Sequence, residues 1–202
     1  MKNKIWCLVI ICAFVFLVGC GSRNAEYIRE VELSASQRDL IYGAGADVFL
    51  VFDLKIEPDK YQRVESWIEH YQSGQLVEKI DRQIYNGSGL RAAKGRLVFT
   101  LRENILDRDK TEYRVSISVD GMRATAWELL ETGERDGHSF IKANSEQAIV
   151  EGQAIMLAVQ AKGRSTEIVS DEIFRGNKEE FAKLLKNDEV FVYYLQFLDE
   201  AD

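Results

Sequence analysis

Residues 48–56 read Val-Phe-Leu-Val-Phe-Asp-Leu-Lys-Ile and carry the clearest indication of how this chain folds. Aromatic and β-branched residues are enriched in strands, and here both faces are apolar before an alternation begins at Asp53. Pro58 stands two residues after Ile56 and punctuates the segment. The stretch therefore predicts a central strand of a β-sandwich.

The two segments that come next, residues 62–71 and 76–85, flank the polar sequence Gln72-Ser73-Gly74-Gln75 and predict a β-hairpin. Apolar and ionic pairing agree on one cross-strand alignment, because opposite charges and matched apolar side chains favour the same partners. That register sets Ile68 opposite Ile80, Val64 opposite Ile84 and Glu69 opposite Lys79.

Short alternating segments recur along the rest of the chain. We expect strands at residues 97–101, 113–119, 123–130, 140–143, 153–161 and 189–198, whereas residues 166–174 are ambiguous. Short strands at close spacing without strand–helix alternation predict a mainly β protein, an antiparallel β-sandwich that is immunoglobulin-like in general architecture.

One short helix is expected near the C-terminus. Asn177 is a suitable N-cap, and Glu180 stands three residues later, where it would complete a capping box. The helix would end at Asn187-Asp188. Its apolar stripe would consist of Phe181, Leu184 and Leu185.

The N-terminus has the order of a secretory signal. Lys2 and Lys4 precede fourteen uncharged residues, 5–18, and a small residue and a cysteine follow at Gly19-Cys20. A bilayer-spanning helix needs about 20 apolar residues, so this run is short for a permanent span.

The sequence Leu17-Val18-Gly19-Cys20 resembles the lipobox of bacterial lipoproteins. The resemblance implies that residues 1–19 are removed and that a diacylglyceryl group is attached to the thiol of Cys20. Two or more acyl chains hold a protein stably on a membrane without any spanning helix. An uncleaved anchor helix and a cytosolic protein with an apolar start are the alternatives.

These assignments divide the chain into residues 1–19 as signal peptide, 20–26 as lipidated cysteine and short tether, and 27–202 as a single β-sandwich domain. Without Lys2 and Lys4 the mature chain has 24 basic and 33 acidic residues, a formal charge of −9. Such an acidic body argues against nucleic acid as a partner and against electrostatic docking on anionic lipid.

All three cysteines, Cys7, Cys12 and Cys20, lie in the signal or at its cleavage point. The domain therefore has no thiol for a disulfide or for a thiolate metal site. We expect neither a metal nor another cofactor.

Aromatic residues are the best candidates for binding. In the expected hairpin register Trp67 and Tyr71 share a face, and with Tyr85 and Trp127 they could form a platform for a sugar ring or a partner protein. Core packing is the alternative for Trp67 and Trp127. Our predicted binding residues are Trp67, Tyr71 and Trp127.

Two polar groups of residues are weaker candidates for a site. His70, which could pair with Glu78, and His138 have no neighbouring Cys or His that would complete a familiar metal site. An oxygen-rich turn has the ligand type that calcium prefers, but it lacks the EF-hand spacing, and an ordinary charged turn explains it. Its residues are Asn104, Asp107, Asp109 and Glu112.

The sequence predicts no catalytic residues: no serine lies in Gly-x-Ser-x-Gly, and nothing selects a particular pair of carboxylates. The motifs at residues 67–71 and 188–193 look like those of small uncharacterised lipoproteins of Gram-positive bacteria, a resemblance that implies no activity. We therefore expect a non-catalytic binding module, lipid-anchored at the extracytoplasmic face of the cell membrane, with an envelope protein or glycan as partner. The alternatives are an envelope hydrolase that uses carboxylates and an accessory subunit of a transporter or envelope complex.

Overall fold

The computed structural model of the chain describes residues 26–86, 94–103, 110–119, 122–131, 138–162 and 169–199. The predicted lipidation site Cys20 lies outside these ranges. The described elements are β1 (Tyr27–Glu30), α2 (Ala35–Gly43), β2 (Val48–Lys55), β3 (Arg63–Gln72), β4 (Gln75–Asn86), β5 (Lys94–Glu103), β6 (Lys110–Val119), β7 (Met122–Glu131), β8 (His138–Lys142), β9 (Gln147–Ala148), β10 (Ile155–Lys162), the 3-10 helix η1 (Asp171–Arg175), α3 (Lys178–Leu184) and β11 (Glu189–Leu198).

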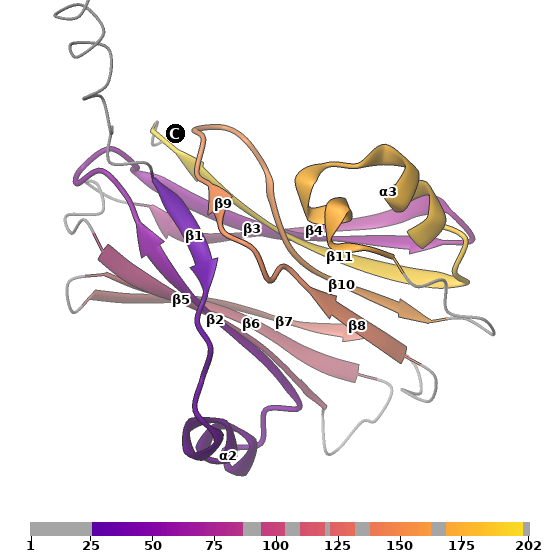
Figure 1. The fold of residues 1–202 in the computed structure, drawn as a ribbon, viewed down its shortest axis with the longest axis horizontal. Helices are drawn as coiled ribbons and strands as arrows, with labels where there is room; N and C mark the ends of the chain where they lie inside the picture. Colours follow the sequence, from indigo (N-terminus) through magenta and orange to yellow (C-terminus); the bar gives the residue numbers. More distant parts are fainter. Residues whose placement is uncertain are drawn as a thin grey trace, which may run out of the picture.

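The strands form two antiparallel sheets that face each other (Figure 1). One sheet has six strands in the order β7-β6-β5-β2-β1-β9, and the other has five in the order β4-β3-β11-β10-β8. The predicted antiparallel β-sandwich with a short helix near the C-terminus is confirmed. Strand β2 lies between β5 and β1, so it has the interior position that its apolar sequence predicts.

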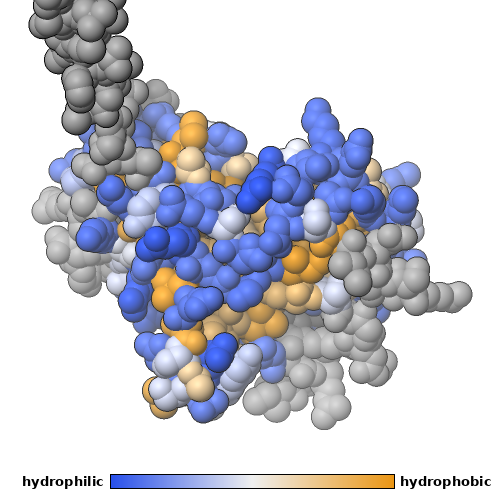
Figure 2. Space-filling model, in the orientation of Figure 1, coloured by the Kyte–Doolittle hydropathy of each residue, from blue (hydrophilic) through white to orange (hydrophobic). Residues whose placement is uncertain are grey.

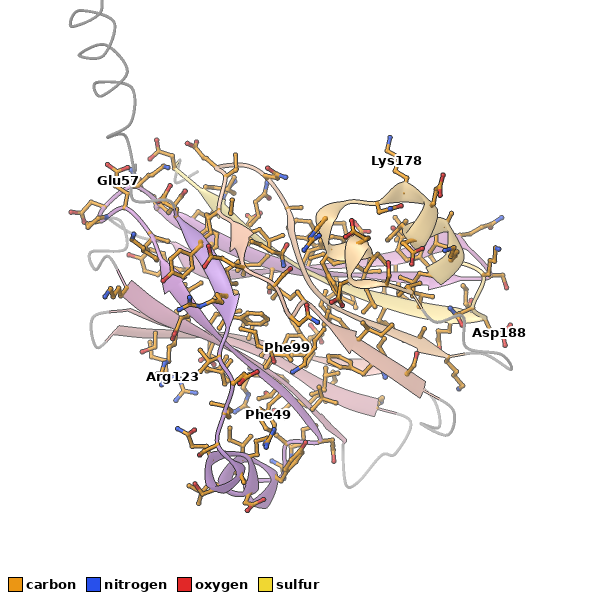
Figure 3. The ribbon with its side chains drawn as sticks, viewed as in Figure 1. Phe49, Glu57, Phe99, Arg123, Lys178 and Asp188 are labelled. Carbon is orange, nitrogen blue, oxygen red and sulfur yellow. The ribbon has the colours of Figure 1, made fainter. Side chains whose placement is uncertain are left out.

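Strand β2 needs two apolar faces because both of them are covered. Its inward residues join one hydrophobic cluster between the sheets, together with Phe99 of β5 (Figure 3). On the other face Phe49 packs edge-on against Tyr42 of α2, with ring centroids 5.1 Å apart. The inward residues are Leu50, Phe52 and Leu54, each 2% exposed.

The β3–β4 hairpin closes through a tight turn. The strands stop at Gln72 and resume at Gln75, so that Ser73 (φ 49°) and Gly74 (φ 77°) form a two-residue loop. Two consecutive residues with positive φ are typical of a type I′ turn, whose twist matches that of the flanking strands.

The predicted register of this hairpin is right at its centre and wrong at its far end. The pairs Ile68–Ile80 and Glu69–Lys79 are confirmed. Val64, however, lies opposite Tyr85, because the register shifts by one residue between Val64 and Glu65. The extra residue is Ile84, which is 6% exposed and joins the core between the sheets. A bulge of this kind increases the local twist of a strand pair.

A helical layer covers the outer face of the five-stranded sheet. Figure 1 shows η1 and α3 lying on this face, on the side away from the six-stranded sheet. A second hydrophobic cluster fills the space beneath them and includes Val159, Val192, Ile173, Phe174 and Leu184. The segment that was ambiguous in sequence thus contributes the 3-10 helix of this layer.

The predicted N-cap of α3 is confirmed, but the predicted capping box is not formed. The side chain of Asn177 accepts hydrogen bonds from the backbone N–H groups of Glu179 and Glu180, at 2.9 and 3.2 Å. Glu180 does not complete the box: its carboxylate accepts from the backbone N–H of Ser170 at 2.7 Å and pairs with Lys183. The Glu180 carboxylate therefore links α3 to Ser170, the residue that precedes η1. Both helices pack on the same sheet.

Helix α2 was missed in the sequence, although Ser34 and Gln37 have capping-box spacing. The side chain of Gln37 accepts from the backbone N–H of Ser34, and Ser34 caps the helix in return. Its residues are mostly polar and exposed, so the apolar periodicity is weak. None of the helices in the described residues is both long enough and apolar enough to cross a bilayer.

Candidate functional site

An open groove of about 560 Å³ lies on the outer face of the five-stranded sheet. One side is formed by residues 145–148, Val150 and residues 153–156, around β9 and the start of β10, and the other by residues 173–178 and Phe181. We call it the cap groove. Figure 2 shows a hollow in the upper outline of the molecule between the loop that precedes β10 and the helical layer. Cavities that hold small ligands have volumes of roughly 300–1,000 Å³.

The floor of the cap groove is apolar because two neighbouring strands turn their outward residues toward it. Met156 of β10 lies opposite Tyr194 of β11, and both line the groove. The register then shifts before Ala158, so that Leu157 joins the core between the sheets. Ile173, Phe174 and Phe181 complete the apolar lining from the helical side.

Two of the predicted binding residues, Trp67 and Tyr71, contact residues that line the cap groove. Trp67 stacks on Tyr194 with ring centroids 5.1 Å apart, and Tyr71 meets Phe181 edge-on at 5.8 Å. Glu69 lies between the two and accepts hydrogen bonds from the indole N–H of Trp67 at 3.2 Å and from the hydroxyl of Tyr71 at 2.6 Å. We call Trp67, Glu69, Tyr71 and Tyr194 the aromatic shelf.

Burial raises the pKa of both tyrosines of the shelf. It raises the pKa of the Tyr71 hydroxyl well above its ordinary value, and the hydrogen bond to Glu69 raises it further. Burial also raises the pKa of Tyr194, with a smaller contribution from the charge of Glu69. Trp67 itself is only 8% exposed, so it positions Tyr194 and offers little surface of its own.

The third predicted residue, Trp127, is not part of this arrangement. It lies on β7 of the six-stranded sheet, opposite Arg114, and is 58% exposed. Tyr85, also considered as part of a platform, is partly buried and packs against the core between the sheets. The structure therefore brings Trp67 and Tyr71 together and places Trp127 on the other sheet.

The polar candidates of the sequence do not converge on the cap groove. Nε2 of His70 lies 2.9 Å from Glu189 rather than bonding Glu78, and its ring stacks on Phe191. Glu112 pairs with Arg114 at 2.7 Å. Asn104, Asp107, Asp109 and the side chain of His138 lie outside the described residues.

The described lining of the cap groove contains three charged side chains, Glu146, Arg175 and Lys178. Glu146 is the one carboxylate among the described residues that line it, and it faces Arg29 at 3.8 Å. The described residues contain no cluster of three or more His, Cys, Asp or Glu side chains that could hold a metal ion. Apolar side chains form the floor, and Arg175 and Lys178 stand at the rim.

Sequence reasoning missed the cap groove because its parts come from distant segments. Phe181 was expected in a core-facing stripe, and Met156 carries no periodic signal that would separate it from the buried residues of β10. The only sequence indication was local: Ile173-Phe174, Gly176 and the cap Asn177 mark a short apolar turn before a helix.

Comparison with known proteins gives one match. A protein-family model described as the YgaN domain matches residues 27–197. None of the curated proteins compared with the chain matches it. No solved structure matches it either.

Proposed function

The chain belongs to the YgaN domain family, and we propose that it is a lipid-anchored binding module at the extracytoplasmic face of the cell membrane. The observation that carries the binding part of this proposal is the cap groove, an open and largely apolar recess of about 560 Å³. A recess with this lining suits an envelope component that has an apolar part, because burial of apolar surface drives association.

The anchor part of the proposal rests on the lipobox at residues 17–20 and on the charged and apolar segments before it. The family match begins at Tyr27, so the domain starts directly after the proposed tether. Nothing in the groove favours hydrolysis, since its described lining contains a single carboxylate.

Metabolic labelling with an alkyne fatty acid tests the anchor. In the host, the wild-type chain should become labelled and lose its leader, whereas Cys20→Ala should do neither. Cys12→Ala is the matched control, because it makes the same change inside the predicted leader and should leave labelling intact. Label that persists in Cys20→Ala, or a wild-type chain that keeps its leader and stays unlabelled, would contradict the proposal.

A further inference from the structure

We infer that the cap groove holds an acyl chain of a phospholipid from the membrane to which the protein is tethered. The inference rests on the proposed function, because the anchor brings the groove close to the bilayer. It deepens that function by naming the class of ligand. Three features of the described residues support it: where the tether leaves the domain, how firmly it is held there, and what lines the groove.

The tether leaves the domain at the edge of the cap groove. The carbonyl of Glu26, the first described residue, accepts a hydrogen bond from the backbone N–H of Ile149 at 3.0 Å. Both neighbours of Ile149, Ala148 and Val150, line the groove. Cys20 lies six residues before Glu26, a span of roughly 20 Å at full extension. A lipid on Cys20 therefore keeps this side of the groove within about that distance of the bilayer.

Glu26 is bound firmly enough to fix this exit point. Its carboxylate accepts hydrogen bonds from the backbone N–H of Glu57 at 2.7 Å and from the hydroxyl of Tyr61 at 2.9 Å, and it pairs with Lys60. Burial alone would raise the pKa of the Glu26 carboxyl, but the bonds from Lys60, Glu57 and Tyr61 lower it below its ordinary value. The carboxylate is thus charged and held at physiological pH. In Figure 3 Glu57 lies on the side of the molecule where β1 begins.

The floor of the cap groove can take a hydrocarbon chain. Ile155, Met156 and Phe174 there offer no strong donor or acceptor, and the polar side chains of the lining, among them Gln147, Gln153 and Asn177, are left to meet water or a head group. Each methylene removed from water contributes about 0.8 kcal/mol, so an acyl chain gains affinity along its whole length. Met156 is flexible and can adapt to chains of different shape. Val150 at the edge is 49% exposed, which leaves an apolar entrance.

The rim can receive the head group. Arg175 and Lys178 stand on the helical side of the groove, and Figure 3 shows Lys178 extending from the start of α3 away from the sheets. Arg175 is already paired with Glu172 at 2.8 Å, so Lys178 is the more available cation. A phosphate of a phospholipid would find a complementary charge here although the body as a whole is acidic. Apolar burial, not net charge, is the main source of affinity.

Site-specific photocrosslinking of the full-length chain in its native membranes tests this inference. A benzophenone amino acid replaces Phe181 in the groove, the cells are irradiated, and the crosslinked peptide is identified by mass. We expect the mass of a phospholipid on the Phe181 peptide. The same photoreactive residue at the exposed Trp127 on the other sheet is the matched control and should give no lipid adduct.

A second variant tests the floor of the groove. Met156→Glu, combined with the photoreactive residue at 181, places a charge against the acyl chain and should reduce the lipid adduct at least about fivefold. Circular dichroism of the same variant checks that the sheets are intact. An unchanged adduct yield in a folded Met156→Glu chain would overturn the inference.

Other outcomes of the crosslinking also decide the question. The inference would be overturned if residue 181 gave no adduct, or if its adduct were with a protein, with a glycan or with the chain's own Cys20 peptide. Equal lipid adducts at residues 181 and 127 would also overturn it. Fatty-acid labelling of Cys20 in the same sample separates the two proposals. A labelled Cys20 without a groove adduct leaves the anchored binding module standing, whereas an unlabelled Cys20 removes both.

Discussion

Leu184 and Leu40 allow a sharp test of the helical layer that builds the cap groove. Both are leucines on short helices, but Leu184 of α3 is 0% exposed and Leu40 of α2 is 75% exposed. Leu184 packs in the second hydrophobic cluster, between α3 and the outer face of the five-stranded sheet. Truncation of Leu184 should therefore destabilise the protein far more than the same change at Leu40.

The expected magnitudes follow from burial. Leu→Ala at a fully buried site costs about 2–5 kcal/mol, because the lost transfer energy is joined by the cost of the cavity. Taking about 3 kcal/mol, Leu184→Ala should lower Tm by roughly 6–12 °C, since 1 kcal/mol shifts Tm by about 2–4 °C in a protein of this size. Leu40→Ala should change the free energy of unfolding by less than about 0.5 kcal/mol.

The assay is thermal unfolding of the chain from Gly21 onward, followed by far-ultraviolet circular dichroism, with amide hydrogen exchange as a second measurement. The two clusters are separate, so Leu184→Ala should also speed exchange of the α3 amides more than that of β2. Midpoints of the two variants within 2 °C of each other, with unchanged exchange in α3, would show that α3 is not held as we describe.

Three further predictions concern single contacts. Glu26→Gln should lower the free energy of unfolding by about 1 kcal/mol at pH 7, after allowance for solvent screening. Because hydrogen bonds hold the folded pKa of Glu26 below 4.5 despite burial, this stabilisation is present above pH 4.5 and lost as the pH falls through the folded pKa. Urea titrations of both proteins should therefore converge in acid, and an equal gap at pH 7 and in acid would be contrary to this. Tyr193→Phe removes a buried hydroxyl that donates to Oε1 of Gln160 at 2.8 Å, and should cost about 1–3 kcal/mol in the urea midpoint analysis. An unchanged midpoint would mean that the bond contributes nothing. Gly74→Ala should destabilise by about 1–2 kcal/mol, because φ is +77° and a Cβ would lie 3.2 Å from a backbone carbonyl oxygen. In Gly43→Ala the new Cβ meets nothing within 4 Å, so this control should be neutral or stabilising; equal losses at both sites would argue against the strained turn.

Much of the strand pattern was predictable because alternation and punctuation are local properties. The last strand was expected at residues 189–198 and is observed there as β11. The segment 48–56 was expected as an interior strand, and β2 is one. The helix that Asn177 caps was also expected, because the cap bond forms within one turn of backbone.

Elements that depend on remote partners were missed. Strand β1 has four residues, and its position is set by pairing with β2 and β9 rather than by its own sequence. The far end of the hairpin register was wrong because Ile84 inserts as an extra residue to reach the core. Glu180 satisfies Ser170 instead of its own helix start because tertiary packing brings η1 beside α3.

The sequence by itself determined the fold class, the order of most strands along the chain and the N-cap of α3, because these follow from side-chain alternation and from hydrogen bonds within a few residues. It also supplies the prediction of a lipid anchor at Cys20. Only the tertiary structure decided that Trp67 and Tyr71 stand together while Trp127 lies on the other sheet, and that an apolar groove opens beside Glu26. The reason is that the groove joins segments that are distant in the sequence. Pairing of β10 with β11 brings Met156 beside Tyr194, and packing of the helical layer on these strands adds Phe181. No local sequence pattern encodes the strand pairing or the helix packing.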